Sequence, residues 1–200
     1  MYLITLVNFV KNPFMEILEL LTERLNLIAG TADIFRAGID DRQLIGEKLE
    51  AIVPDSWVPE HYEQHVLDFF ADLLAKHPDS RGWTLWYMVL RDEVKRERLI
   101  IGNAGFKGLP DSGGTVEIGY SVLPEYQRAG YASEAVAGLI AWAFSHPQVE
   151  RVIAETYPEL TPSKRVLEKN GFGYIGNGSE ERVIRYELTR KNYEKIWRDI

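Results

Sequence analysis

The chain contains no cysteine, and this absence removes several kinds of chemistry. Disulfide bonds, a thiolate nucleophile and cysteine-ligated zinc are all excluded. An apolar stretch runs from Tyr2 to Val10, but Thr5 and Asn8 interrupt it, and it is shorter than the roughly 20 apolar residues that span a bilayer. It has neither a basic segment before it nor a small-residue cleavage site after it. We therefore expect a cytoplasmic protein.

The chain has fewer positively charged than negatively charged side chains. The 23 lysines and arginines are outnumbered by 30 aspartates and glutamates, which gives a net charge of −7. Broad nucleic-acid binding needs a positive footprint, so we expect neither a nucleic acid nor a membrane as partner. The acidity suits a cationic ligand, but it also aids solubility, which is the simpler explanation.

Familiar phosphate-binding and catalytic signatures are absent as well. The sequence has no Walker A loop, no dinucleotide-binding G-x-G-x-x-G and no G-x-S-x-G elbow. His61 and His65 are spaced for one helical face, yet HYEQH is not the HExxH zinc pattern and no third ligand is evident. We expect no metal site and two surface histidines.

What is present is the patterning of one mixed α/β domain. The first half predicts a strand over 22–28, a helix over 41–52 and a longer helix from Pro59 to Lys76. Three strand candidates follow, over 83–91, 98–107 and 115–123. Only short turns separate these three, so we expect them to pair antiparallel in hairpin order.

The second half predicts a parallel crossover. Small and apolar residues from Ala132 to Phe144 recur at spacings of an amphipathic helix, and a strand over 151–156 follows. A short helix is expected with Thr161 as N-cap and Pro162 in its first turn, and Gly171 is expected in a left-handed turn that packs Phe172 on Leu167. A strand over 183–188 and a helical tail from 189 complete the prediction.

The segment QRAGYA, residues 127–132, lies between the strand that ends near 123 and the helix that starts near 132. Its small residues at 130 and 132 leave room for a ligand to approach the backbone. The helix N-terminus that follows offers unpaired N–H groups and a positive dipole end, which together bind phosphate groups. A plain tight strand-to-helix connection is the alternative.

This segment resembles the acetyl-CoA signature Q/R-x-x-G-x-G/A of the GNAT N-acetyltransferase family. VEIGYSVLPEYQRAGYASEA and SKRVLEKNGF are similar to the family's signature region and C-terminal helix, and TERLNL resembles the opening strand of the ribosomal-protein serine/alanine (RimJ/RimL-like) subgroup. The resemblance implies a mixed, mostly antiparallel sheet. One parallel pair of its strands splays near a bulge, and helices flank the sheet.

The resemblance also implies acetyl-CoA as co-substrate and places its contacts. Pantetheine would lie beside Ser121 to Leu123, with a backbone N–H near Val122 as oxyanion donor. Backbone N–H groups from Arg128 to Ser133 would hold the pyrophosphate. The full expected set is Ser121, Val122, Leu123, Gln127, Arg128, Ala129, Gly130, Tyr131, Ala132 and Ser133.

Two residues are candidates for proton transfer. Glu117 stands where many GNAT enzymes carry a glutamate that can act as base, although it could equally be a plain strand residue. The resemblance makes Ser163 the candidate acid, because Leu167 occupies the position of the family's tyrosine. A helix-start serine bonded to backbone is the alternative. Leu160 is a departure, since the subgroup has an asparagine there that touches pantetheine.

The acceptor side rests on weaker signals. Several aromatic and acidic residues in the first half could surround an amine, although core positions and helix caps explain them at least as well. They are Trp57, Trp83, Trp86, Tyr87, Asp33, Asp40, Asp41 and Asp55.

The function implied is transfer of acetyl from acetyl-CoA to a primary amine by direct attack, with a protein N-terminus as one acceptor. Three alternatives stay open. They are an acetyltransferase for a small amine such as a polyamine, amino acid or drug, a catalytically weak acetyl-CoA-binding module, and an unrelated anion-binding α/β protein. GNAT domains often form dimers, so a homodimer is also compatible.

Residues 1–14 form a separate case, because Met15 begins MEILELLTERL, a natural start for the domain over 15–200. We expect either an extra N-terminal extension or a start codon upstream of the natural one. The intact mass of the native protein decides between them, and a full-length mass refutes the alternative start.

Overall fold

The computed structural model describes residues 18–37, 41–57 and 63–197. The segment over 1–14, Asp40 and His61 lie outside these ranges. The strands are β1 (Glu19–Leu21), β2 (Leu25–Ala29), β3 (Leu85–Asp92), β4 (Glu97–Phe106), β5 (Thr115–Val122), β6 (Arg151–Thr156), β7 (Gly173–Asn177) and β8 (Ile184–Thr189). The helices are α1 (Ala32–Ala37), α2 (Arg42–Leu49), α3 (Gln64–Lys76), α4 (Tyr131–Phe144), α5 (Thr161–Lys169) and α6 (Arg190–Trp197), with 3-10 turns at Pro78–Ser80 and Pro124–Tyr126.

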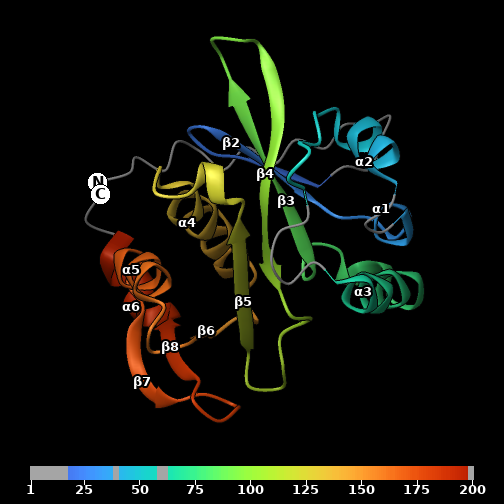
Figure 1. The fold of residues 1–200 in the computed structure, drawn as a ribbon. Coiled ribbons are helices and arrows are strands. Elements are labelled where there is room, and N and C mark those ends of the chain that lie inside the picture. Colours follow the sequence, from blue (N-terminus) through green and yellow to red (C-terminus); the bar gives the residue numbers. More distant parts are fainter. Residues whose placement is uncertain (1–17, 38–40, 58–62, 198–200) are drawn as a thin grey trace.

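All eight strands form one sheet in the order β1-β2-β3-β4-β5-β6-β8-β7. Every neighbouring pair is antiparallel except β5 and β6, which run parallel. Helices α1, α2 and α3 lie on one side of the sheet and α4, α5 and α6 on the other (Figure 1). This confirms the predicted mixed sheet with one parallel crossover pair. None of the described helices is long and apolar enough to cross a membrane.

Each face of the sheet carries its own apolar core because side chains alternate along the strands. Trp86 and Met88 of β3 pack with Trp142 of α4, whereas Tyr87 and Val89 face the cluster built by α1, α2 and α3. The aromatic residues considered for an acceptor wall are core residues. They are Trp57, Trp83, Trp86 and Tyr87, and none is more than 3% exposed.

The predicted first strand over 22–28 is wrong in one respect, because the chain turns back at its start. The backbone N–H of Thr22 donates to the carbonyl of Leu25 (2.9 Å), and the Thr22 hydroxyl accepts from the N–H of Leu25 (3.1 Å). A threonine that bonds locally in this way favours a turn over a strand. The result is the hairpin of β1 and β2, joined by Thr22, Glu23 and Arg24.

The predicted start of α5 is off by one residue. Leu160 is the N-cap, its side chain makes no capping bond, and Thr161 is already helical. Pro162 is therefore the second residue of the helix. Its missing N–H costs no helical hydrogen bond, because an N–H at this position has no partner within the helix. Asp41, in contrast, is the N-cap of α2 and accepts from the N–H of Leu44 (2.9 Å), so its reading as a cap is confirmed.

The end of α5 matches the prediction in detail. Gly171 has a φ of 84°, a left-handed conformation that glycine adopts at little cost. The N–H of Phe172 donates to the carbonyl of Leu167 (3.1 Å), and the N–H of Gly171 donates to that of Glu168 (3.0 Å). These two bonds define a Schellman motif, and Phe172 and Leu167 are both buried in the same core.

Arg190 anchors the C-terminal end of α4 to the following loop. Its guanidinium donates to the carbonyls of Phe144 (2.9 Å), His146 (2.7 Å) and Val149 (2.9 Å). Phe144 is the last residue of α4, and the last turn of a helix leaves its carbonyls without helical partners, so Arg190 satisfies one of them.

We expect Arg190→Met to lower the free energy of unfolding by about 3 kcal/mol, because it removes three charge-assisted hydrogen bonds while keeping the apolar stem. Urea denaturation measures this change. Lys191→Met is the control, because Lys191 is exposed and should change the free energy by less than about 0.5 kcal/mol. Equal midpoints for the two variants would contradict the anchoring role.

Candidate active site

The sheet opens between its two parallel strands. β5 and β6 pair over three residue pairs only, from Thr115 with Arg151 to Glu117 with Ile153. Beyond Glu117, β5 continues to Val122 beside β4, while β6 stays paired with β8 over six residue pairs. The strands therefore diverge, and the second half of β5 has no strand on one side.

The open edge of β5 presents specific backbone groups. The carbonyl of Glu117 accepts from the N–H of Lys107, the residue after β4, and the N–H of Leu123 donates to the carbonyl of Ile101. Along a strand, the backbone N–H and carbonyl groups of alternate residues point the same way. The backbone groups of the odd-numbered residues of β5 therefore face β4, and the backbone groups of Tyr120 and Val122 face the opening. The bulge that the resemblance implied is not in this strand, because the register between β4 and β5 runs without a shift from Ile118 to Val122.

The loop from β5 to α4 has an unusual backbone. Arg128 has a φ of 62° and Gly130 a φ of 87°, so two residues in three adopt the left-handed region. Gly130 is the N-cap of α4, no side chain caps this turn, and its carbonyl accepts the first helical bond from Glu134 (3.1 Å). No described residue accepts a hydrogen bond from the N–H groups of residues 128–133.

These N–H groups converge at a helix N-terminus beside the open edge of β5. Ala129 and Arg128 are exposed, Ser133 is 7% exposed, and Tyr131 and Ala132 are partly buried. The Gln127 side chain holds the loop closed by donating to the carbonyl of Val122 (2.9 Å). The residues predicted to hold the cofactor thus follow one another along the end of β5, the loop and the start of α4, although Val122, Leu123 and Ser133 among them are buried.

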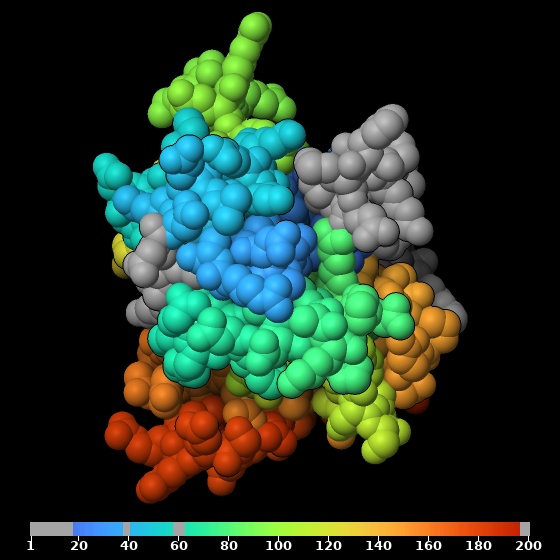
Figure 2. Space-filling view, turned by 90° about the vertical axis from the view of Figure 1, so that its right-hand side faces the viewer, coloured from blue at the N-terminus to red at the C-terminus, as the bar shows by residue number. Residues whose placement is uncertain are grey.

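Glu117 lies on the sheet face that α1, α2 and α3 cover. Figure 2 shows this face, with those helices across its middle and the β7–β8 end of the sheet below them. The carboxylate of Glu117 forms an ion pair with the ammonium of Lys107, a partner that no sequence pattern predicted. The side chain of Glu117 is 21% exposed and that of Lys107 is 64% exposed, so solvent reaches both. Next to Glu117 on the same face, Gly119 leaves open space, because no described atom would lie within 4 Å of a Cβ added there.

Ser163 lies on the opposite face, in the first turn of α5. Its hydroxyl is 3.1 Å from the hydroxyl of Tyr120, which can also donate to the Ser163 carbonyl (3.1 Å). Burial raises the pKa of Tyr120 to about 12, so this phenol stays protonated near neutral pH and keeps a proton to donate. Tyr120 was not among the site residues predicted from the sequence, because its partner Ser163 is 43 positions away and only the folded sheet brings the two together.

The two positions that depart from the subgroup pattern have different surroundings. Leu167 is fully buried in the core, so no group at this position of the chain can reach the opening as an acid. Leu160 is 46% exposed at the start of α5 and offers no polar atom beyond its backbone. His65 is exposed on α3, and the described residues contain no group of three His, Asp or Glu side chains that could hold a metal.

Comparison with known proteins decides the family. Residues 43–173 match the family model described as acetyltransferase (GNAT) domain, which is more than half of the chain. The chain belongs to the GNAT acetyltransferase family. An unrelated anion-binding protein is thereby excluded.

Among curated GNAT relatives, an uncharacterized N-acetyltransferase of Bacillus subtilis, YjdG, is 35% identical over 106 residues. That match covers 53% of this chain and 61% of the relative, so the likeness spans well under two thirds of the relative's length.

Solved structures show the same fold. The ribosomal-protein-S5-alanine acetyltransferase from Vibrio fischeri covers 88% of this chain and 98% of its own, at 19% identity and a TM-score of 0.59. Mycobacterium smegmatis RimJ, in complex with CoA-disulfide, covers 84% of this chain and 82% of its own, at 20% identity and a TM-score of 0.53.

Proposed function

We propose that this GNAT chain is an acetyl-CoA-dependent N-acetyltransferase that moves acetyl to a primary amine by direct attack. This proposal rests on the opening between β5 and β6 and on the N-terminus of α4, which no side chain caps. Pantetheine is an extended chain with two amides, which can pair with the backbone groups of Tyr120 and the N–H of Val122, while Gln127 already occupies the carbonyl of Val122. The pyrophosphate suits the unpaired N–H groups of residues 128–133.

The two faces of β5 divide the proton transfers. Glu117, on the α1–α3 face, takes the proton from the attacking amine once the ammonium of Lys107 has left the Glu117 carboxylate. The N–H of Val122 stabilises the negative charge on the carbonyl oxygen as the nitrogen–carbon bond forms. Ser163, on the other face, donates a proton to the sulfur as the carbon–sulfur bond breaks, and Tyr120 holds its hydroxyl in place. Since the chain has no cysteine, no thiol can carry the acetyl group.

A protein N-terminus is the acceptor that the structure favours. The open space at Gly119, beside the partly exposed side chain of Glu117, suits a group that approaches on a chain better than a closed pocket would. The neighbour from Vibrio fischeri is named for a ribosomal protein, which agrees with this choice. A small amine remains the alternative acceptor. A homodimer and a cytoplasmic location stay predictions.

The cofactor site is tested by calorimetry with acetyl-CoA. Ala129 is exposed at the loop, so Ala129→Glu places a negative charge near the pyrophosphate without disturbing the core. We expect it to weaken binding about tenfold, whereas Ala129→Gln, of the same size, should change it little. If the folded wild type does not bind acetyl-CoA, or if both variants bind as it does, the proposed site is wrong.

The acid role of Ser163 is tested by steady-state kinetics with an N-terminal peptide acceptor. Ser163→Ala should lower kcat by roughly 100-fold and leave KM for acetyl-CoA nearly unchanged, since general acid catalysis contributes on that scale. Ser163→Thr keeps a hydroxyl and should retain most of the activity. A Ser163→Ala variant with the wild-type kcat would leave Ser163 a structural contact of Tyr120.

A further inference from the structure

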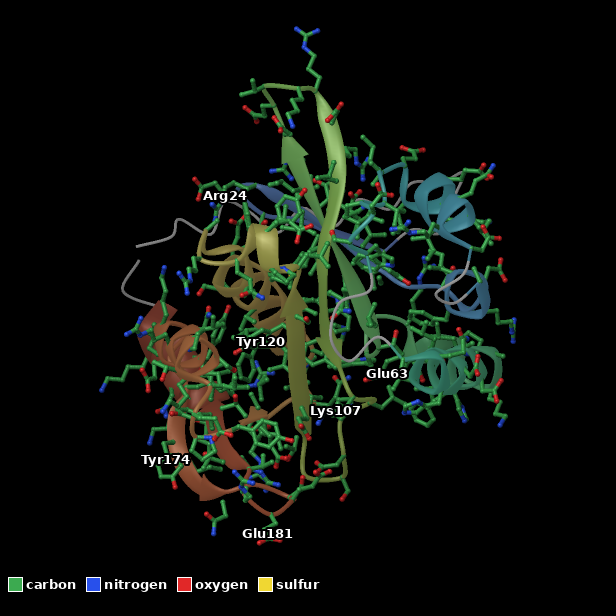
Figure 3. The ribbon with its side chains drawn as sticks, viewed as in Figure 1. Arg24, Glu63, Lys107, Tyr120, Tyr174 and Glu181 are labelled. Carbon is green, nitrogen blue, oxygen red and sulfur yellow. The ribbon has the colours of Figure 1, made fainter. Side chains whose placement is uncertain are left out.

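The turn between β1 and β2 reaches across the molecule to the start of α4. The carboxylate of Glu134, in the first turn of α4, is 5% exposed and accepts three donors from this turn. They are the hydroxyl of Thr22 (2.6 Å), the backbone N–H of Arg24 (2.6 Å) and Nε of Arg24 (2.7 Å). Figure 3 shows Arg24 beside the N-terminal end of α4. A buried carboxylate with this many donors fixes the position of the arginine.

Arg24 holds the phosphate-binding loop on both sides of Gly130. One terminal nitrogen of its guanidinium donates to the carbonyl of Ala129 (2.9 Å). The guanidinium carbon also lies 4.4 Å from the centre of the Tyr131 ring, within cation–π range. One side chain therefore contacts the residue before the N-cap, the residue after it and the first turn of the helix.

The bond to Ala129 has a directional consequence. The carbonyl of Ala129 and the N–H of Gly130 belong to one planar trans peptide, so they point in opposite directions. Holding the carbonyl of Ala129 against Arg24 therefore aims the N–H of Gly130 away from Arg24. The left-handed Arg128 adds strain to this loop, and such strain persists only where surrounding contacts enforce it.

We infer that Arg24 is a positioning residue for the pyrophosphate of acetyl-CoA, acting through Ala129 and Gly130 on a loop that it preorganises before the cofactor arrives. The inference rests on the proposed cofactor site and adds a residue that precedes that site by more than a hundred positions. Arg24 does not need to touch the cofactor for this role, since its guanidinium is already engaged by Glu134 and Ala129.

Arg24→Lys is the sharpest variant. Lysine keeps the charge and can still pair with Glu134, but its single ammonium lacks the planar fork that serves Glu134 and Ala129 together. We expect the Kd for CoA to rise about fivefold to tenfold, because the loop loses one charge-assisted bond. The Kd for pantetheine, which has no pyrophosphate, should stay unchanged. Calorimetry with each ligand measures both.

Thr22→Val is the matched control. It removes a donor to the same carboxylate and keeps the shape of the side chain, but it leaves the Arg24 contact with Ala129 in place. It should lower the urea midpoint without changing the Kd for CoA. An Arg24→Lys variant that binds CoA like wild type, or that loses CoA and pantetheine affinity equally, overturns the inference while the cofactor site stands. A wild type that does not bind CoA overturns both.

Should Arg24→Lys fail to fold, the pair Arg24→Met and Glu134→Gln removes both charges together, so no buried carboxylate is left unpaired. The doubly substituted protein should show the same selective loss of CoA affinity. Equal losses for CoA and pantetheine in this protein would again count against a positioning role.

Discussion

The site depends on one stretch of β5 whose backbone groups have a partner strand on one side only. A strand in the middle of a sheet normally satisfies its backbone from both sides. β5 does so only as far as Glu117, because β6 remains bound to β8 and does not follow it. The remaining N–H and carbonyl groups of Tyr120 and Val122 face a gap, and Gln127 satisfies only one of them. The rest of the site is arranged around this edge.

The gap passes through the sheet and thereby relates the two catalytic candidates. Glu117 and Gly119 belong to one face of β5, whereas Tyr120 and its partner Ser163 belong to the other. Because side chains alternate along β5, Glu117 lies on one face, while Tyr120 lies on the other and contacts Ser163 of α5.

Sequence patterns predicted the features that form locally. The helix after QRAGYA, the parallel crossover and the Schellman motif at Gly171 each depend on residues within one segment, and all three are present. The β1–β2 turn was missed because its bonds between Thr22 and Leu25 lie within a segment whose pattern resembles a strand. β7 was missed because two glycines and a bulge hide its alternation. Lys107, Tyr120 and Arg24 could not be assigned from the sequence, because each acts on a partner that only the folded sheet brings near.

At each end of helix α4, an arginine from elsewhere in the chain forms hydrogen bonds with the helix. Arg24 holds the first turn across a separation of 110 residues, and Arg190 holds the last carbonyls across 46. Contacts this far apart in sequence form late in folding, because closing long loops is entropically costly before the contacts reward it. The helix itself can therefore form early from local contacts, whereas the loop before it gains its contact with Arg24 only when the β1–β2 turn has packed against the helix.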